Sequence, residues 1–298
     1  MNHLAALNVA YLGPYGTFSS FVARQYLRLR SAEPPHDPSL AACPDLDDLF
    51  ERLEDGRSTH GVVPTANTLG GGVGPGFDLL LRHKPAIRAE FYARIRHCLL
   101  SRESKLEDIR VLYSHPQPLI QAGKWLRQHL PGVKTITVDS TAASAARAGQ
   151  EPGSAGIGRE ELAGLYSLRI LGRSIEDDPD NWTRFILITR EEAEETGLPR
   201  PDSSIWRSSL LFTLADRPGA LTAALRPLAE QGLNLLRLES RPLPGAGRWA
   251  CAFFADFEGN LAAPCMREPM SAMQKACQTL RLLGTYPTGP YLDEGDLP

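Results

Sequence analysis

The segment Glu191–Ser204 divides this chain of 298 residues into a longer and a shorter part. It holds two prolines, a glycine and a cluster of acidic residues, which is typical of a linker between domains. The whole chain is about twice the usual length of one domain, so more than one folding unit is expected. We therefore expect a first region over 1–192, a linker over 193–206 and a second domain over 207–290.

Short apolar strands alternate with capped helices throughout residues 1–192. The first strand leads through a glycine turn into a helix that begins near Thr17 or Ser19. Its predicted apolar face is Phe18, Val22, Tyr26 and Leu29. The expected strands are Asn8–Leu12, Gly61–Val63 ending at Pro64, Ala93–Leu100, Arg110–Tyr113, Val133–Val138, Gly153–Gly158 and Phe185–Thr189. This alternation predicts an α/β fold with parallel sheets, and its length suits two lobes.

Residues 207–290 show a different, β-α-β-β-α pattern. Leu210, Phe212 and Leu214 alternate as in a half-buried strand, and a helix with a leucine face follows. Two further strands are expected at Leu233–Leu238 and Trp249–Phe257, before a last helix. This order predicts a ferredoxin-like α+β domain.

Charge and cysteine content limit the possible functions. A net charge of -3 and a pI near 6.2 give no basic excess that would favour nucleic acid or an anionic membrane as partner. The five cysteines are widely spaced and form no C-x-x-C pair, so neither a disulfide framework nor a zinc site is expected. No apolar stretch approaches the length of a membrane span. We expect a cytoplasmic protein that uses no metal and no cofactor.

Polar side chains follow several of the predicted strands, where open α/β sheets bind their ligands. The turn Gly13–Ser19 places hydroxyl groups and free backbone N–H groups at a helix start, which either binds an anion or only caps the helix. The donors at the other strand ends are neutral, and together they suit a carboxylate better than a metal. These candidates are Thr17, Asn67, Thr68, Ser114, His115, Gln117, Ser140 and Thr141.

The pentapeptide Asn181-Trp182-Thr183-Arg184-Phe185 combines a hydroxyl donor with a guanidinium group. A guanidinium is the side chain best shaped for bidentate binding of a carboxylate. An ion pair at the start of a strand explains the arginine equally well. The residues alone leave these two interpretations open.

Four motifs, in this order, resemble those of the prephenate dehydratase family: Gly13–Ser19, Gly61–Thr68, Ser114–Gln121 and Asn181–Phe185. The C-terminal part resembles the ACT domains of those enzymes through Gly219-Ala220-Leu221 and Glu239-Ser240-Arg241-Pro242. The resemblance implies a lyase that converts prephenate to phenylpyruvate in phenylalanine biosynthesis. It also implies a catalytic region like a type II periplasmic binding protein, with lobe 1 at about 1–90 and 174–192 and lobe 2 at about 91–173.

The resemblance also implies roles for individual residues. Thr183 is expected to donate a hydrogen bond to the departing oxygen, and Arg184 to hold a substrate carboxylate or to fix the segment that bears Thr183. Asn67 and Thr68 complete the expected catalytic group. The expected substrate-binding residues are Thr17, Ser114, His115, Gln117, Ser140, Thr141 and Phe185. His115 and Glu160 also match family positions.

In the C-terminal domain the resemblance implies feedback control by phenylalanine, bound where two ACT domains meet in a homodimer or homotetramer. The expected phenylalanine-binding residues are Gly219, Ala220, Leu221, Asn234, Glu239, Ser240, Arg241 and Pro242. No chorismate mutase segment is expected before the first strand, which implies a monofunctional enzyme.

One departure from the family pattern bears on the substrate. The family usually has isoleucine-glutamate before Asn67, whereas this chain has Thr65-Ala66. Loss of a carboxylate beside the cleft leaves two alternatives to a prephenate dehydratase: an arogenate dehydratase, or a catalytically weakened homologue that senses an amino acid.

Overall fold

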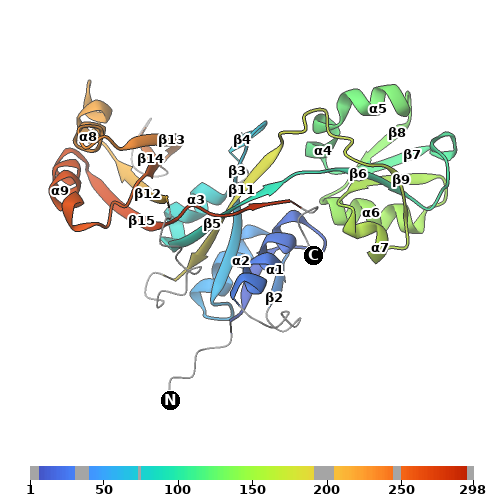
Figure 1. Cartoon of the computed structure of the whole chain (residues 1–298), viewed down its shortest axis with the longest axis horizontal. Coiled ribbons are helices and arrows are strands. Elements are labelled where there is room, and N and C mark those ends of the chain that lie inside the picture. The colour runs from blue at the N-terminus through green and yellow to red at the C-terminus, as the bar shows by residue number, and fades with distance from the viewer. Residues whose placement is uncertain (1–6, 31–39, 73–74, 191–204, 244–249, 294–298) are drawn as a thin grey trace, which may run out of the picture.

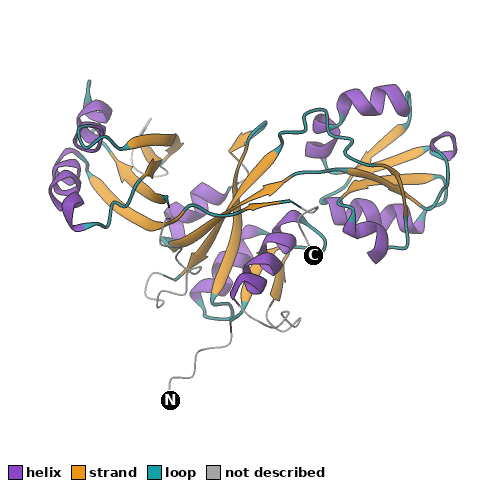
Figure 2. Cartoon of the chain, viewed as in Figure 1, coloured by secondary structure: helices purple, strands orange, loops and turns teal. Residues whose placement is uncertain are grey.

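The fold is seen in a computed structural model of the chain, shown in Figure 1. It describes residues 7–30, 40–72, 75–190, 205–243 and 250–293. The predicted linker at 193–206 lies outside the described residues except at its last two positions. Three sheets, each with its own helices, follow one another along the long axis of the molecule (Figures 1 and 2).

The first lobe is built on a seven-stranded sheet with the order β16-β5-β11-β3-β1-β2, and β4 pairs with β3. Its strands are β1 (Val9–Leu12), β2 (Leu40–Cys43), β3 (His60–Asn67), β4 (Gly71–Gly72), β5 (Ala86–Arg94), β11 (Trp182–Thr189) and β16 (Tyr291–Leu292). Strand β1 is parallel to β2 and β3, but β11 runs antiparallel to β3 and β5. The sheet is therefore mixed. Its antiparallel strand β11 is added after the chain returns from the second lobe.

Helices cover both faces of this sheet, which explains its apolar strands. They are α1 (Phe18–Arg30), α2 (Leu46–Glu54) and α3 (Gly76–His83). Helix α1 packs on one face and α2 and α3 on the other. The predicted face of α1 was wrong at Leu29, which is 48% exposed, while Phe21 is buried. The last three residues of α1, 28–30, are all exposed.

Strand β3 does not end at Pro64, as the sequence predicted, but continues to Asn67. Phe185 pairs with Pro64 and Arg184 with Ala66, so Thr65 is an extra residue in a β-bulge. A proline has no N–H group for a regular ladder, and a bulge is one of the places where a strand accepts it. The extension carries Asn67 up to Thr183 on the neighbouring strand.

The second lobe is a five-stranded mixed sheet with the order β10-β6-β9-β7-β8. Its strands are β6 (Cys98–Ser101), β7 (Val111–Ser114), β8 (Lys134–Thr137), β9 (Ser154–Gly158) and β10 (Arg169–Gly172), and its helices are α4 (Pro116–Gln121), α5 (Gly123–His129), α6 (Thr141–Gln150) and α7 (Glu161–Leu165). The predicted strand Ala93–Leu100 is divided between β5 and β6, so the chain crosses between lobes inside it. Helices α4 and α5 are separated by a break at Ala122.

The C-terminal domain has the ferredoxin-like order β-α-β-β-α-β. Its elements are β12 (Trp206–Thr213), α8 (Ala220–Ala229), β13 (Asn234–Pro242), β14 (Cys251–Glu258), α9 (Arg267–Ala276) and β15 (Thr279–Pro287). The antiparallel sheet has the order β13-β14-β12-β15, and both helices lie on one face (Figure 1). Leu214 lies just after β12, and the sequence pattern had not included β15.

The other face of this sheet packs against the first lobe. Leu211, Phe254 and Tyr286 belong to the same buried cluster as Phe77 and α2. At Gly284 the two backbones approach so closely that an added Cβ would lie 2.0 Å from the carbonyl oxygen of Ile87. After β15 the chain adds β16 to the edge of the first sheet, beside β5. The C-terminal domain is thus joined to the catalytic region by a shared core and a shared sheet.

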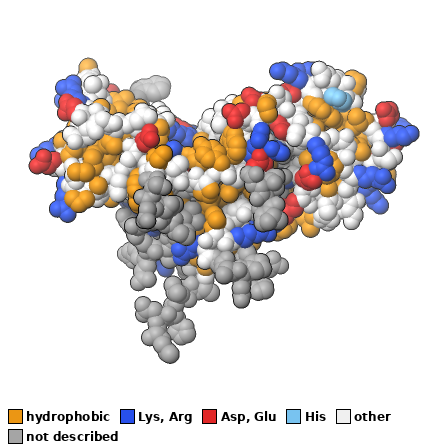
Figure 3. Space-filling model, in the orientation of Figure 1, with side chains coloured by type: hydrophobic (Ala, Val, Ile, Leu, Met, Phe, Trp, Pro, Cys, Tyr) orange, Lys and Arg blue, Asp and Glu red, His pale blue; other side chains and the backbone are white. Residues whose placement is uncertain are grey.

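The surface view shows no single patch of one charge. Lysine, arginine, aspartate and glutamate side chains are scattered over the visible face (Figure 3). Within the described part of the chain, no helix has both the length and the apolar character needed to cross a membrane.

Candidate active site

A cavity of about 830 Å³ lies between the two lobes. The first lobe supplies the turn before α1 and the adjacent ends of β3 and β11, and the second lobe supplies the starts of α4 and α6. The polar residues in its wall are Thr17, Ser19, Asn67, His97, His115, Gln117, Gln121, Asp139, Ser140, Thr141 and Thr183. Thus most of the residues predicted to act on substrate, from four separated motifs, share one cavity.

Asn67 and Thr183 form the central contact of the first-lobe wall. The Asn67 Oδ1 atom accepts hydrogen bonds from the backbone N–H groups of Leu69 and Gly70, each 3.0 Å away. This fixes the orientation of the amide, so Nδ2 is the atom that donates to Thr183 Oγ1 at 3.0 Å. Since the Thr183 oxygen accepts this bond, its own proton is left to donate. The buried Thr183 hydroxyl is therefore a positioned donor that faces the cavity.

Thr17 caps the helix that follows it. Its Oγ1 atom donates to the carbonyl of Leu12 at 3.0 Å and accepts from the backbone N–H of Ser20 at 3.3 Å. The capping interpretation therefore accounts for the Thr17 hydroxyl, although the residue also lines the cavity. Ser19, buried two residues further along, lines the same wall.

Two helix starts form the wall on the second lobe. His115 caps α4 by accepting from the backbone N–H of Gln117 at 3.2 Å, and Ser140 caps α6 by accepting from Ala143 at 3.0 Å. Burial lowers the pKa of His115, and Asp139 partly opposes this. Ser140 and Thr141 at the start of α6 line the cavity, and the partial positive charge of a helix N-terminus favours a negatively charged ligand there.

Two predicted residues of these motifs lie outside the cavity wall. Ser114 is buried beneath it and donates to the carbonyl of His115 at 2.9 Å. Thr68 donates to the carbonyl of Asp180 and accepts from the backbone N–H of Trp182, both at 3.0 Å. Neither hydroxyl points at a ligand, so Ser114 supports a loop and Thr68 holds the segment that enters β11.

His97 is a member of the wall that the sequence analysis missed. It lies where the chain crosses between lobes, is 1% exposed, and its Nε2 lies 2.8 Å from Gln121 Oε1. Burial lowers the pKa of His97 to about 4, although the hydrogen bond with Gln121 acts to raise it. It is therefore neutral at physiological pH. Gln121 ends the Ser114–Gln121 motif and was within reach of sequence reasoning, whereas nothing around His97 marked it.

Arg184 departs from the expected role of a carboxylate ligand in the cleft. Side chains alternate between the faces of a strand, and Thr183 and Phe185 line the cavity, so Arg184 points to the opposite face. There its guanidinium contacts Glu90 at 2.8 Å and Asp256 of the C-terminal domain at 2.6 Å. The remaining expected role, which is to fix the segment that bears Thr183, agrees with this position.

Ala66 also points away from the cavity wall. It pairs directly with Arg184 on β11, and residues that pair across strands have their side chains on the same face. It is not among the residues that line the cavity. The glutamate that the family usually has at this position would therefore lie on the face of Arg184, not among the cavity-lining groups.

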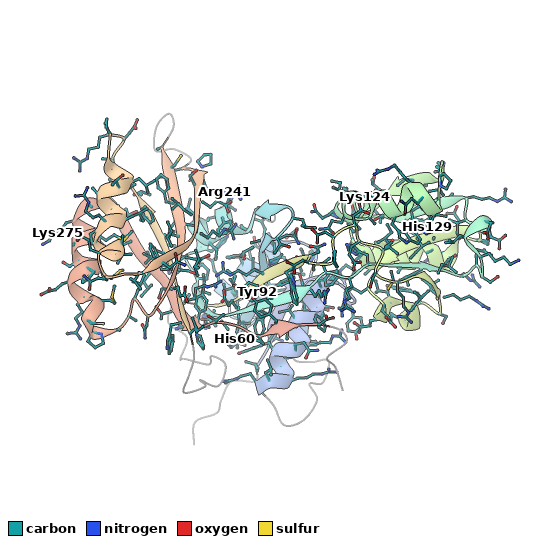
Figure 4. The ribbon with its side chains drawn as sticks, turned by 45° about the horizontal axis from the view of Figure 1, so that its top comes forward. His60, Tyr92, Lys124, His129, Arg241 and Lys275 are labelled. Carbon is teal, nitrogen blue, oxygen red and sulfur yellow. The ribbon has the colours of Figure 1, made fainter. Side chains whose placement is uncertain are left out.

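The predicted phenylalanine-binding residues fall into two groups. Gly219, with φ +78°, starts α8 in the left-handed region that favours glycine, and Leu221 packs into the domain core. Glu239 and Arg241 form an ion pair at 2.6 Å. They face the catalytic region, as Figure 4 shows for Arg241. Ala220 on α8 is buried, and Asn234, Ser240 and Pro242 are exposed along β13.

A second cavity, of about 550 Å³, lies on the other side of the crossing between lobes. Glu161 on α7 binds Arg24 of α1 at 2.5 Å and accepts from the Tyr15 hydroxyl at 3.0 Å, so it connects the two lobes. The neighbouring Glu160 forms an ion pair with Arg173 and does not line the first cavity. Burial acts to raise the pKa of Glu161, but Arg24, Arg159 and Tyr15 hold it below its usual range.

The fold and the cavity define a two-lobed protein with a neutral hydroxyl donor and the start of a helix in the wall between its lobes. The family model for prephenate dehydratase matches residues 9–193. The chain belongs to the prephenate dehydratase family.

Individual relatives cover nearly all of the chain. It is 36% identical over 282 residues to the bifunctional chorismate mutase/prephenate dehydratase of Pseudomonas aeruginosa, which covers 94% of this chain and 73% of that protein. A prephenate dehydratase from Arthrobacter aurescens, solved with L-Phe, is 29% identical with a TM-score of 0.81, covering 94% of this chain and 90% of that one. GqqA, described as a novel type of quorum quenching acylase, is also 29% identical, with a TM-score of 0.80 and coverage of 95% and 98%.

Proposed function

We propose that this protein converts prephenate to phenylpyruvate with the Thr183 hydroxyl as the donor to the departing oxygen. The observation that carries the proposal is the hydrogen bond from Asn67 to Thr183, in which the threonine oxygen accepts and its proton is left to donate. Family membership supports the same reaction. The start of α6 across the cavity would hold a carboxylate of the substrate.

The reaction needs little covalent chemistry from the protein. The bond from the ring to one carboxylate breaks, its electron pair enters the ring, and the ring C–OH bond breaks. One proton is taken up, so that carbon dioxide and water leave. Aromatisation supplies the driving force, and a threonine is too weak an acid to act as a freely titrating proton donor. Thr183 therefore acts as a preorganised donor to developing charge on the leaving oxygen.

Formation of phenylpyruvate from prephenate by purified protein tests this proposal. Thr183→Ala should lower kcat by about a hundredfold or more, the typical cost of losing one preorganised donor. Thr183→Ser, which keeps the hydroxyl, should retain much of the activity. Thr135→Ala, an exposed threonine on β8, is the matched control. Equal rates for wild type and Thr183→Ala would reject the role of Thr183.

Arogenate, with an amino group where prephenate has a keto group, is the second candidate substrate. The Thr65-Ala66 pair motivates the comparison, although Ala66 lies off the cavity wall. The ratio of kcat/KM for the two substrates decides between them. A weakened sensor would instead bind phenylalanine and turn over neither substrate.

We also propose that the C-terminal domain is an ACT domain that binds phenylalanine and inhibits the two-lobed catalytic region. The L-Phe complex of the Arthrobacter aurescens relative supports this. Gly219–Leu221 and Glu239–Pro242 would meet across two copies in a dimer or a dimer of dimers. Widely spaced cysteines without a C-x-x-C pair fit a cytoplasmic location. Calorimetry with phenylalanine on wild type and Gly219→Ala tests the site. An added Cβ meets no atom there, so the variant mainly strains the backbone.

A further inference from the structure

A closed ring of hydrogen bonds connects the back of the Thr183 strand to the C-terminal domain. Arg184 donates to Asp256 Oδ2 at 2.6 Å and to the Tyr286 hydroxyl at 2.8 Å. Ser209 has one hydroxyl proton, which it gives to Asp256, so Tyr286 donates to Ser209 and completes the ring. Glu90 on β5 binds the third side of the guanidinium at 2.8 Å.

The ring is buried and balanced in charge. Glu90 and Tyr286 are fully buried, and Arg184 and Asp256 are 7% and 8% exposed. Burial acts to raise the pKa of Asp256, but Arg184 and the Ser209 hydroxyl hold it below its usual range. Arg207, also from the C-terminal domain, binds Glu90 at 3.0 Å, so two arginines face two carboxylates. Loss of one partner from such a cluster leaves a buried charge undercompensated.

The position of Arg184 connects this ring to the cavity. Its neighbours on β11, Thr183 and Phe185, both line the cavity, so the guanidinium fixes the strand from behind. The bulge at Thr65 lies across from the same place, and the Thr65 hydroxyl donates to the backbone carbonyl of Arg184 at 3.3 Å. A bulge interrupts the ladder, so side-chain contacts contribute more to the local position of β11 here than in a regular sheet.

We propose that Asp256 and Tyr286 of the C-terminal domain are positioning residues for Thr183, acting through Arg184. This inference rests on the proposed function. Without the Asp256 charge, the guanidinium shifts towards Glu90, and β11 moves with it. The Thr183 hydroxyl then loses its alignment with Asn67 and with the departing oxygen. The C-terminal domain thereby completes the active site from the far side of the sheet.

Steady-state kinetics on the full chain, with prephenate and without phenylalanine, tests this inference. For Asp256→Asn we expect kcat to fall about tenfold, and for Tyr286→Phe about threefold, with KM changed less than about twofold, because misplacement of a donor by a fraction of an ångström affects mainly the chemical step. Thr213→Val is the matched control. It removes a partly buried hydroxyl pair with Thr279 at the C-terminal end of β12, away from the ring. It should leave both constants within about twofold of wild type.

A double-variant cycle separates positioning from general damage. If Asp256 acts through Thr183, Asp256→Asn should lower the residual rate of Thr183→Ala by less than about twofold, because the aligned hydroxyl is already absent. Two outcomes would overturn this inference and leave the proposed function in place. One is an equal loss of kcat in Asp256→Asn and Thr213→Val. The other is a wild-type kcat in folded Asp256→Asn and Tyr286→Phe. If Asp256→Asn fails to fold, Tyr286→Phe decides by the same criteria. No phenylpyruvate from the wild type would overturn the proposed function, and this inference with it.

Discussion

The amide of Asn67 donates to the hydroxyl of Thr183 across 3.0 Å, and this bond connects the ends of β3 and β11 at the cavity. Its direction is set by the two backbone N–H groups that bind Asn67 Oδ1. Asn67→Asp keeps the size and the Oδ1 contacts but replaces the donor with an acceptor. The aspartate would accept the hydrogen bond from the Thr183 hydroxyl that the departing oxygen needs. We expect kcat for prephenate to fall about a hundredfold.

Asn181→Asp serves as a control for added charge near this site. Asn181 is buried beside Asn67 and accepts from its Nδ2 through Oδ1, at 2.8 Å, so an aspartate there preserves the accepted bond. We expect a smaller loss of kcat than for Asn67→Asp. Equal losses would show that the added charge, and not the lost donor, governs the rate.

The Glu161 carboxylate connects the lobes through Arg24 and Tyr15, on the side of the crossing away from the catalytic cavity. Glu161→Gln should favour open lobes and raise KM for prephenate by about twofold to fivefold, with little change in kcat, because a partly exposed ion pair contributes at most about 1 kcal/mol. The neighbouring Glu160→Gln is the matched control, since its partner Arg173 is exposed and lies outside the first lobe. A kcat effect as large as the KM effect would contradict the role in lobe closure.

His97 should make the protein less stable in mild acid. Burial lowers its pKa to about 4 in the folded state, whereas an unfolded histidine titrates near pH 6.5. Between these values the unfolded state binds more protons than the folded state. The contribution of neutral His97 to the free energy of unfolding is therefore fully present above about pH 6.5, and it is lost as the pH falls towards 4. The free energy of unfolding should fall by about 3 kcal/mol from this group over that range.

Denaturant unfolding of wild type and His97→Gln across this pH range measures the effect. The variant retains an amide near Gln121 but cannot titrate, so its stability should depend less on pH. Some dependence should remain, because burial also lowers the pKa of His60 to about 4. His129→Gln, at an exposed position on α5, should behave as wild type. Parallel curves for wild type and His97→Gln would reject the prediction.

The order of elements could be predicted from the sequence because each is specified locally. Alternating apolar residues and capping hydroxyls, such as Ser140 before α6, mark strands and helix starts wherever they occur. The motif residues met in one cavity because strand ends share an edge of a sheet. The errors came from tertiary contacts. Pro64 continues its strand only because a bulge on β3 accommodates it, and β11 begins three residues earlier than expected because it pairs with Asn67 and Arg94.

Sequence motifs could not predict the orientation of the Arg184 side chain or the place of His97 in the cavity wall. The reasons differ. Strand alternation places Arg184 opposite Thr183, but only once the strand is known to begin before Thr183. The partners of Arg184, Asp256 and Tyr286, are 72 and 102 residues away in sequence, so no local pattern predicts these contacts. His97 depends on the place where the chain crosses between lobes, which falls inside a continuous apolar stretch.

The proposed dimer makes a prediction about the outer edge of the C-terminal sheet. Strand β13 is an edge strand, and it exposes Leu236 and Leu238 at 41% and 37%. An edge strand with exposed leucines pairs readily with a second copy. Leu238→Lys should therefore shift the protein to monomers in sedimentation or light scattering, and it should weaken phenylalanine binding if two copies complete the site. Leu165→Lys, at an exposed leucine on α7 of the second lobe, should leave the mass unchanged. A Leu238→Lys protein with the mass of the wild-type oligomer would place the interface elsewhere.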